Sequence, residues 1–465
     1  MECFKVYANE IEGRLDPFYY KPEFVKPVRK IKESNFGFVR FGEIIQDISG
    51  GATPRIGGDF YLYSGIPFLR VQNITEEGIN LEDVKFIKKE VHEKMLKRSQ
   101  LHENELVFTI TGRIGSVAVV PKNFEGNINQ HSVRIKLKEY FSNNQILPEY
   151  IALFFNLKIG RMLSFRKTTG GTRPALDYEA IKDLVIPLPD TRKQKELIDR
   201  IKQAYSLKKA KESSAQQLLD SIDDYVLDEL GIKLPELKDK MCYAVNYSSI
   251  RGRVDPYYYQ PKFAEVEKAI ERGKFEIKEL MEFIKISNEL ENINNYETIN
   301  YIDLASINKD LGSIQKIKQI SSKEAPSRAK QKIERGDLLV SSLSGSLKSI
   351  AVFREEGNNY IASTGFYVIK KSEEYNNYFL FALFRSLPYQ IIMEREATGA
   401  IMPAINRDSF LNLKIPLPPL EIQNKIAEEV KARMQKAEKL QEEAKSILEE
   451  AKEKVERIIL GNEEI

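Results

Sequence analysis

Two stretches of this 465-residue chain, residues 190–230 and 420–460, contain neither glycine nor proline. Each stretch has 41 residues and is followed by a glycine, Gly231 or Gly461, the residue type that most often ends a helix. Apolar residues recur within both stretches at intervals of three, four or seven, which is the spacing of one face of an α-helix. The sequence therefore predicts two long helices of equal length, each about 60 Å long at 1.5 Å per residue.

A long helix with one narrow apolar stripe is not stable alone in water, so each stripe needs a partner. We expect the two helices to pair along their stripes, and to run antiparallel if the halves of the chain are related by a pseudo-twofold axis. The alternative is that each helix packs on its own globular neighbour. The predicted seam consists of Leu197, Ile201, Tyr205, Leu218, Ile222, Val226, Ile426, Val430, Ala437, Leu440, Ala444 and Ile447.

The rest of the chain is also duplicated. Residues 14–24, RLDPFYYKPEF, return as RVDPYYYQPKF at residues 253–263, with seven of eleven positions identical. A second motif begins at Thr169 and again at Thr398: Thr-Gly, then Pro-Ala, then Ile-Pro-Leu-Pro, then Gln. Both pairs keep the same order and nearly the same spacing, so chance similarity between proline-rich turns does not explain them. The chain is an internal duplication.

Strand-like alternation followed by helical stretches lies between the repeated motifs, which indicates mixed α/β domains. The predicted fold class is α/β (α+β), with two globular domains separated by two long antiparallel coiled-coil helices in a pseudo-twofold repeat. The expected segments are an N-terminal repeat segment 1–34, a first globular domain 35–189, a central long helix 190–235, a linker with the second repeat segment 236–265, a second globular domain 266–418, and a C-terminal long helix 419–465.

Composition and motifs argue against metal-dependent and nucleotide-driven chemistry. Two cysteines, Cys3 and Cys242, exclude a disulfide framework and a cysteine-rich zinc site, and the three histidines have no metal-ligand spacing. The sequence has no GxxxxGK[ST] phosphate loop and no Ser-His-Asp set of any specificity. An N-terminus without an apolar signal, and apolar runs too short to span a bilayer, predict a cytoplasmic protein that is not associated with a membrane.

The repeated Asp-Pro-Phe-Tyr at 16–19 and Asp-Pro-Tyr-Tyr at 255–258 look like the D-P-P-Y motif of amino-methyltransferases. That motif needs a second proline, and Phe18 and Tyr257 occupy its position here. No glycine-rich cofactor loop follows a predicted strand near either copy. We therefore interpret the two copies as structural turns and predict no catalytic residue.

Local charge offers a better indication of function than the net charge of +3, which excludes only a globally basic protein. Residues 161–173 contain four basic residues and no acidic one, with two adjacent glycines. Fork-shaped and amide side chains elsewhere are of the types that read guanine and adenine edges. Each residue alone could equally belong to a solvated loop, but one such loop per domain favours DNA contact. The candidates are Arg70, Gln72, Asn73, Thr111, Arg113, Asn129, Gln130, Arg166, Lys167 and Arg173 in the first domain, and Lys330, Lys332, Ser341, Ser342, Ser344 and Lys348 in the second.

Three motifs together resemble a known family. They are Gly-Ala-Thr-Pro at 51–54 followed by GIPFLRVQNI at 65–74, the TGGTRP turn at 169–174, and the Ile-Pro-Leu-Pro…Gln element that occurs twice at a helix start. The chain resembles the specificity subunit of type I restriction–modification systems over essentially its whole length. The second domain departs from the pattern, because residues 298–307 are only a degenerate counterpart of the GIPFLRVQNI segment.

The resemblance implies two target-recognition domains that each bind one half of a split, asymmetric double-stranded DNA target. It also implies that two modification subunits dock on the helices, bind S-adenosylmethionine and methylate adenine, and that restriction subunits use ATP and Mg²⁺ to cut DNA. None of these cofactors would be bound by this chain, which would be non-catalytic. The alternatives are a coiled-coil assembly scaffold with protein-binding globular ends and, third, a degenerate DNA methyltransferase.

Overall fold

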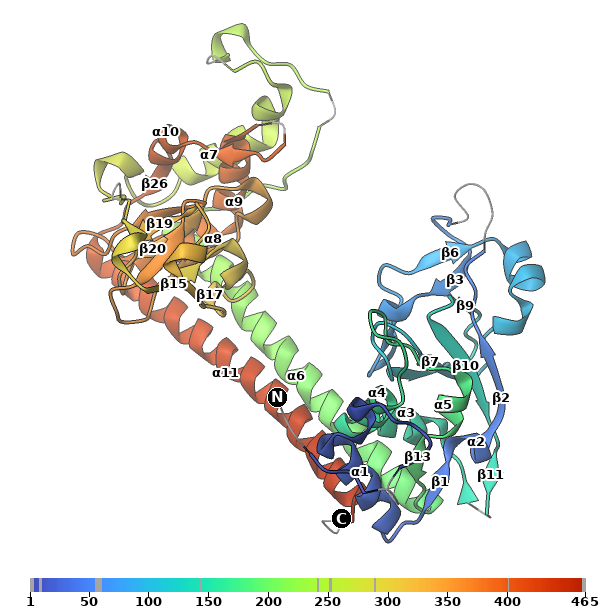
Figure 1. The fold of residues 1–465 in the computed structure, drawn as a ribbon. Coiled ribbons are helices and arrows are strands. Elements are labelled where there is room, and N and C mark those ends of the chain that lie inside the picture. The colour runs from blue at the N-terminus through green and yellow to red at the C-terminus, as the bar shows by residue number, and fades with distance from the viewer. Residues whose placement is uncertain are drawn as a thin grey trace. The chain divides into compact units, whose positions relative to one another are not determined.

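The computed structural model describes residues 4–7, 11–54, 61–142, 144–240, 242–250, 253–287, 290–399 and 401–461 (Figure 1). The chain forms two compact units, one of residues 1–208 with 445–465 and one of residues 209–444. Each unit is a mixed α/β domain that includes part of both long helices. Cys242 is an exposed free thiol, and Cys3 lies outside the described residues.

The first unit is built on an antiparallel sheet of four strands in the order β2-β10-β7-β8, packed beside a three-stranded sheet in the order β6-β3-β9. Its main core joins the inner face of the first sheet to α1, α3 and α4 and to the ends of both long helices. The helices are α1 Pro22–Glu33, α2 Phe41–Ile44, α3 Pro148–Asn156, α4 Lys158–Arg166, α5 Tyr178–Lys182 and α6 Thr191–Leu230. The strands are β1 Phe38–Arg40, β2 Ile45–Gly50, β3 Ile66–Leu69, β4 Ile74–Thr75, β5 Gly78–Ile79, β6 Lys85–Ile87, β7 Leu106–Thr109, β8 Val117–Val119, β9 Asn127–Ile128, β10 Ser132–Leu137, β11 Tyr140–Phe141, β12 Asn144–Gln145 and β13 Val185–Pro187.

The second unit repeats this plan, with a four-stranded sheet β18-β15-β22-β19 and a three-stranded sheet β21-β20-β23. The strands β20, β21 and β23 correspond to β7, β8 and β10, and they are followed by α8 and α9 as β10 is followed by α3 and α4. The helices are α7 Pro261–Glu271, α8 Asn377–Arg385, α9 Leu387–Glu396, α10 Arg407–Leu411 and α11 Leu420–Ile459. The strands are β14 Ile277–Glu279, β15 Thr298–Ile302, β16 Ile307–Asn308, β17 Ser313–Ile314, β18 Lys318–Ser321, β19 Ala329–Lys332, β20 Leu338–Ser341, β21 Ile350–Val352, β22 Tyr360–Ser363, β23 Phe366–Ile369, β24 Ala397–Thr398, β25 Ala404–Ile405 and β26 Lys414–Pro416.

A buried glutamine explains the repeated Ile-Pro-Leu-Pro…Gln motif. Gln194 lies in the first turn of α6, where its Nε2 donates to the carbonyl of Pro189 (3.0 Å) and its Oε1 accepts from the N–H of Leu147 (3.0 Å). Gln423 does the same at the start of α11, with Pro418 (2.9 Å) and Asn376 (3.0 Å). Each glutamine thus joins a long helix to the helix α3 or α8 beside it, and both side chains are almost completely buried. A buried amide with both groups paired fixes where each long helix leaves its domain.

The repeated Asp-Pro segments form turns, as predicted. Asp16 caps a short 3₁₀ helix, Pro17–Tyr20, by accepting from the N–H of Tyr19 (3.0 Å). The buried guanidinium of Arg166 lies 3.8 Å from the centre of the Tyr19 ring and donates to the Tyr19 carbonyl (2.9 Å). In the second unit Asp255 accepts from the N–H of Tyr258 in the same way (3.0 Å), and Arg395 lies 5.0 Å from the centre of the Tyr258 ring but donates to Glu267 and Glu396. The duplicated motif therefore attaches a chain segment to its domain through an arginine–tyrosine stack.

The two long helices pack against each other in antiparallel orientation, as predicted. In the second unit, Lys211 pairs with Glu443 (2.5 Å), Arg433 donates to the carbonyl of Ser221 (2.7 Å), and Glu229 pairs with Lys425 (2.8 Å). Residue numbers rise along α6 as they fall along α11, in constant register. The pairing therefore continues without a slip along this part of the seam.

The predicted seam residues are all buried or half-buried, but two kinds of partner cover them. Leu197 and Ile201 enter the main core of the first unit together with Val455 from the end of α11. Val226 and Ile426 enter the main core of the second unit in the same way. Pairing between helices and packing on the neighbouring domain, which the sequence presented as alternatives, thus both occur.

We predict that Ala437→Leu destabilises the helix pair. Ala437 and Ala215 are fully buried in one cluster with Leu311, and a larger side chain there forces the helices apart. The free energy of unfolding should fall by about 1–3 kcal/mol. Urea denaturation followed by circular dichroism measures it, with Lys436→Leu on the exposed face of α11 as the control. Equal stability of the two variants would contradict the close packing.

We also predict that Arg166→Met loosens the first repeat segment. The substitution leaves the Tyr19 carbonyl without its buried donor and should cost about 2 kcal/mol locally. Tyr19 and Tyr20, now 1% and 7% exposed, should become cleavable by chymotrypsin under native conditions. Lys182→Met, at a lysine of α5 whose side chain is 41% exposed, should leave the cleavage rate at the wild-type value. Unchanged protection in Arg166→Met would show that the stack does not hold the segment.

Candidate nucleic-acid interface

Polar side chains in the first unit meet where β7 ends and β10 begins. Thr111 Oγ1 lies 2.6 Å from His131 Nδ1, and Gln130 Nε2 lies 3.0 Å from His131 Nε2. Gln130 also bonds to Thr53, which β2 brings close because Gly51 passes directly against the backbone of residue 129. A chain of hydrogen bonds therefore orients an exposed glutamine amide, a group suited to base edges.

A hairpin stands beside this cluster. Thr169 and Ala175 exchange two backbone hydrogen bonds of 2.9 Å, and Ala175 also pairs with Thr111. Gly170, at φ +93°, takes a left-handed conformation that glycine adopts without strain, which allows the tight turn. Arg173 at the tip and Arg113 on the neighbouring loop are exposed, and neither guanidinium has an ion pair among the described residues. The two arginines are thus available to an anionic ligand.

The segment with Arg70, Gln72 and Asn73 borders the same cluster, since Val71 lies beside Gly112. Arg70 donates to the carbonyl of Asp83 (2.7 Å), and Gln72 donates to its carboxylate (3.0 Å), so Asp83 holds both side chains. Asn73 is 1% exposed, and its amide accepts from the N–H of Arg70 and donates to the carbonyl of Asn80. Asn73 is therefore buried within the loop and fixes its shape.

Arg166, a candidate for DNA contact from the sequence, lies in the interior of the first unit. This side chain is 4% exposed and is held by Tyr19 and Glu12. Lys167 is largely covered and pairs with Asp183 (3.4 Å). The basic run looked like a loop in the sequence, but α4 continues to Arg166 and turns its side chain inward. Asn129, 8% exposed, likewise supports the backbone of residue 131 instead of facing solvent.

The second unit places serines in the corresponding loop. Ser344 N–H donates to the carbonyl of Pro403 (2.9 Å), and the carbonyl of Ser342 accepts from Ile405 N–H (2.8 Å), which joins this loop to the hairpin of β24 and β25. Ser341, another candidate from the sequence, is fully buried, and its Oγ accepts from the N–H of Leu343. Ser342 and Ser344 are half-buried at the surface of the loop.

The predicted basic residues of the second unit are only partly brought together. Lys330 and Lys348 are exposed, and Lys332 pairs with Glu334 (3.7 Å). Lys332 lies opposite Ile361, three residues along β19 from the end that approaches the serine loop. Arg328, exposed at that nearer end, accepts a hydrogen bond through its carbonyl from Thr364 N–H (2.9 Å) and is a better candidate.

The hairpin of the second unit carries residues that the sequence analysis did not select. Ile401 is 95% exposed and Met402 is 56% exposed, where the first hairpin has Thr172 and Arg173. Aligning TGGTRP with TGAIMP through the internal repeat would have identified this pair. The structure also confirms that residues 298–307 are a counterpart of residues 65–74. Ser306 Oγ accepts from the N–H of Asp303 (3.1 Å), as the Asn73 side chain accepts from the N–H of Arg70.

Neither a metal-binding group nor a membrane-spanning helix is present among the described residues. No group of His, Cys, Asp and Glu in the described part of the chain could hold a metal ion. Of the helices that the structure describes, none is long and apolar enough to cross a membrane.

Comparison with known proteins identifies the architecture. The family model described as type I restriction modification DNA specificity domain matches residues 33–219 and 271–449. The MjaVIII specificity subunit of Methanocaldococcus jannaschii is 24% identical over 459 residues, which cover 95% of this chain and 96% of the relative. Two relatives from Escherichia coli match over about a third of both chains: the EcoBI specificity subunit is 24% identical over 34% of this chain and 33% of its own length, and the EcoKI specificity subunit is 26% identical over 38% and 37%.

A solved structure also shares the fold. It is described as the structural basis of complex assembly and conformational transition of the type I R-M system, and it has a TM-score of 0.53 and 14% identity over 91% of this chain and 96% of that chain. The family model covers most of both halves, and the duplicated domains and paired helices agree with it. This chain therefore belongs to the type I restriction–modification specificity subunits, the non-catalytic DNA-recognition components of those systems.

Proposed function

We propose that each globular domain reads one half of a bipartite, asymmetric double-stranded DNA target. The observation that carries the proposal is that equivalent hairpins on equivalent scaffolds end in different side chains. The first hairpin presents Thr172 and Arg173, and the second presents Ile401 and Met402. A common backbone with different tips is what two unlike half-sites require.

The chemistry of each tip favours a different set of bases. A two-stranded β-ribbon fits the major groove, where an arginine fork reads guanine and a glutamine amide reads adenine. Arg113, Arg173 and Gln130 supply these groups in the first unit. Apolar side chains such as Ile401 and Met402 suit the methyl group of thymine. Lys330 and Lys348 would add contacts to phosphates, which set affinity without reading sequence.

We further propose that α6 and α11 set the distance between half-sites and provide docking sites for two modification subunits. A methyltransferase that extrudes its target adenine reads little flanking sequence, so a separate reader supplies specificity. S-adenosylmethionine would be bound by the modification subunits, and ATP with Mg²⁺ by restriction subunits. The assembled complex would act in the cytoplasm.

Exchanging Arg113 and Arg173 together for alanine should weaken DNA binding by the complex with modification subunits. If both arginines contact phosphates, the slope of log Kd against log salt should become shallower by about 1–2. Fluorescence anisotropy at several salt concentrations measures the slope. Lys122→Ala, at the other end of the β8 strand, should keep the wild-type slope.

The outcomes of this experiment separate the roles of the two arginines. Weaker binding with an unchanged salt slope and relaxed sequence preference would assign them to base edges. Binding equal to wild type in every respect would remove both from the interface. If the wild-type complex itself bound no DNA, the coiled-coil scaffold would become the better interpretation.

Lengthening both helices equally should lengthen the unread spacer. Four residues inserted after Leu207 and four after Ser446 preserve the antiparallel register, because the ion pairs of the seam place these positions opposite each other. Four helical residues add about 6 Å, which corresponds to roughly two base pairs. Sequencing of methylated adenines in the host would report the motif. An unchanged spacer would contradict the role of the helices as a ruler.

A further inference from the structure

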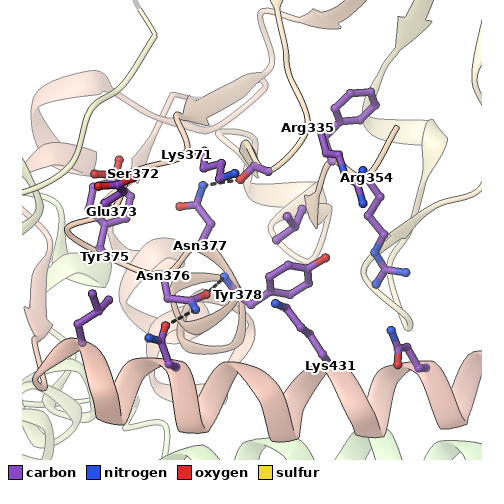
Figure 2. A pocket seen from close by; sticks show the side chains of 16 residues that line it. Arg335, Arg354, Lys371, Ser372, Glu373, Tyr375, Asn376, Asn377, Tyr378 and Lys431 are labelled. Carbon is purple, nitrogen blue, oxygen red and sulfur yellow. Dashed lines mark hydrogen bonds between the residues drawn. The ribbon is translucent and has the colours of Figure 1, made fainter. Parts of the chain in front are cut away.

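The second unit contains a cavity of about 750 Å³ between the start of α8 and one face of α11 (Figure 2). Leu420, Asn424, Lys431 and Gln435 line it from α11, and the loops before β20 and after β21 and β23 form its other walls. Four cationic side chains line the cavity, against one acidic side chain. They are Arg335, Arg354, Lys371 and Lys431, with Glu373.

Two of these cations have carboxylate partners and two do not. Arg335 pairs with Glu356, and Arg354 lies 3.3 Å from Glu438. Lys371 and Lys431 form no ion pair with any carboxylate in the described parts of the chain. Lys431 Nζ lies over the Tyr378 ring, 4.1 Å from its centre, which directs the ammonium group towards the cavity (Figure 2). The lining therefore has two positive charges that are not neutralised locally.

A buried acceptor lies beside these charges. Asn377 is 7% exposed, and its Nδ2 donates to the carbonyls of Gly336 (2.7 Å) and Ile369 (3.3 Å). These carbonyls fix the orientation of the amide, and its Oδ1 has no hydrogen-bond partner among the described residues. A buried acceptor without a donor is costly. The Asn377 amide is therefore a fixed part of the cavity wall, with its Oδ1 covered by protein atoms, and the charge of the lining is what selects a ligand.

The shape of the cavity favours an extended ligand. The lining residues of α11 span positions 420 to 435, or about 22 Å along the helix axis. An extended peptide of about seven residues has this length. The cavity also lies at the end of β20 that follows Gly336, whereas the candidate DNA loop follows the other end of this strand at Ser341. The cavity is therefore not part of the candidate DNA interface.

We propose that this cavity binds an acidic peptide segment of a protein partner, with carboxylates on Lys371 and Lys431. The proposal goes beyond DNA reading and does not depend on it. Seven residues with two or more carboxylates match the length and charge of the lining, whereas inorganic phosphate matches only the charge.

The corresponding place in the first unit differs in charge. A cavity of about 540 Å³ there is lined by Glu76, Glu77 and Glu149, with Lys202 at the position equivalent to Lys431. Arg161 and Lys452 already pair with Glu76. An acidic peptide is thus favoured by only one of the two duplicated sites, and the expected stoichiometry is one peptide per chain.

The test uses the full-length chain and a fluorescein-labelled peptide of five alternating Asp and Glu residues between two glycines. Fluorescence anisotropy should show saturable binding at one site, and the matching Asn/Gln peptide should bind at least tenfold more weakly. Lys371→Gln with Lys431→Gln should weaken binding roughly tenfold. Lys202→Gln, the equivalent substitution in the first unit, should leave the affinity unchanged.

Two further measurements locate the bound peptide and check that the variants are folded. A photo-crosslinking version of the peptide should label the chain next to Lys371 or Lys431, and circular dichroism should show both variants folded. Equal affinity for the acidic and the Asn/Gln peptides, equal losses in the Lys202 and Lys371/Lys431 variants, or two peptides per chain would overturn it. Competition by duplex DNA with crosslinks at this cavity would assign the site to nucleic acid instead.

Discussion

The narrow apolar stripe of each 40-residue helix is the constraint on which the other features depend. A stripe of this length has to be covered throughout, and no single small domain can cover about 60 Å of helix. The chain covers the helix ends with the domain cores and the remainder by mutual pairing, with the small side chains of Ala215 and Ala437 where a turn of the second domain also packs. Gln194 and Gln423 then fix the junction between each stripe and its domain.

Under the proposed function, duplication would also allow one design to read two unlike DNA sequences. The strand pairs, the capped turn before β4 or β16 and the hairpin after α4 or α9 recur in both units. Side chains at loop tips can differ at little cost in stability, because they contribute little to the core. Arg173 and Met402 occupy such tips, whereas the buried Arg166 and Arg395 occupy equivalent structural positions and are the same residue.

The sequence was sufficient for the helices, the duplication and the structural turns, because these depend on periodicity and on repeated motifs. It was less reliable for individual contact residues. Arg166 and Ser341 were selected by residue type, but burial is decided by tertiary packing that a single sequence does not reveal. Ile401 and Met402 were missed for the converse reason, since exposed apolar residues look like core residues in a sequence. Aligning the internal repeats would have identified Ile401 and Met402, but it would not have revealed that Arg166 and Ser341 are buried.

The net charge of the chain is informative only when the charged residues are located in the structure. A total of 71 basic and 68 acidic residues is close to neutral, yet the cavities beside the two long helices differ in their charged lining. Three glutamates line the first, and two of them, Glu76 and Glu77, have cationic partners, whereas Lys371 and Lys431 line the second without carboxylate partners among the described residues. A duplicated scaffold with identical surfaces would bind the same partner in the same way twice. Under the two proposals, divergence of charge beside the seam would make the two halves distinguishable to a partner protein, as divergence of the hairpin tips would make them distinguishable to DNA.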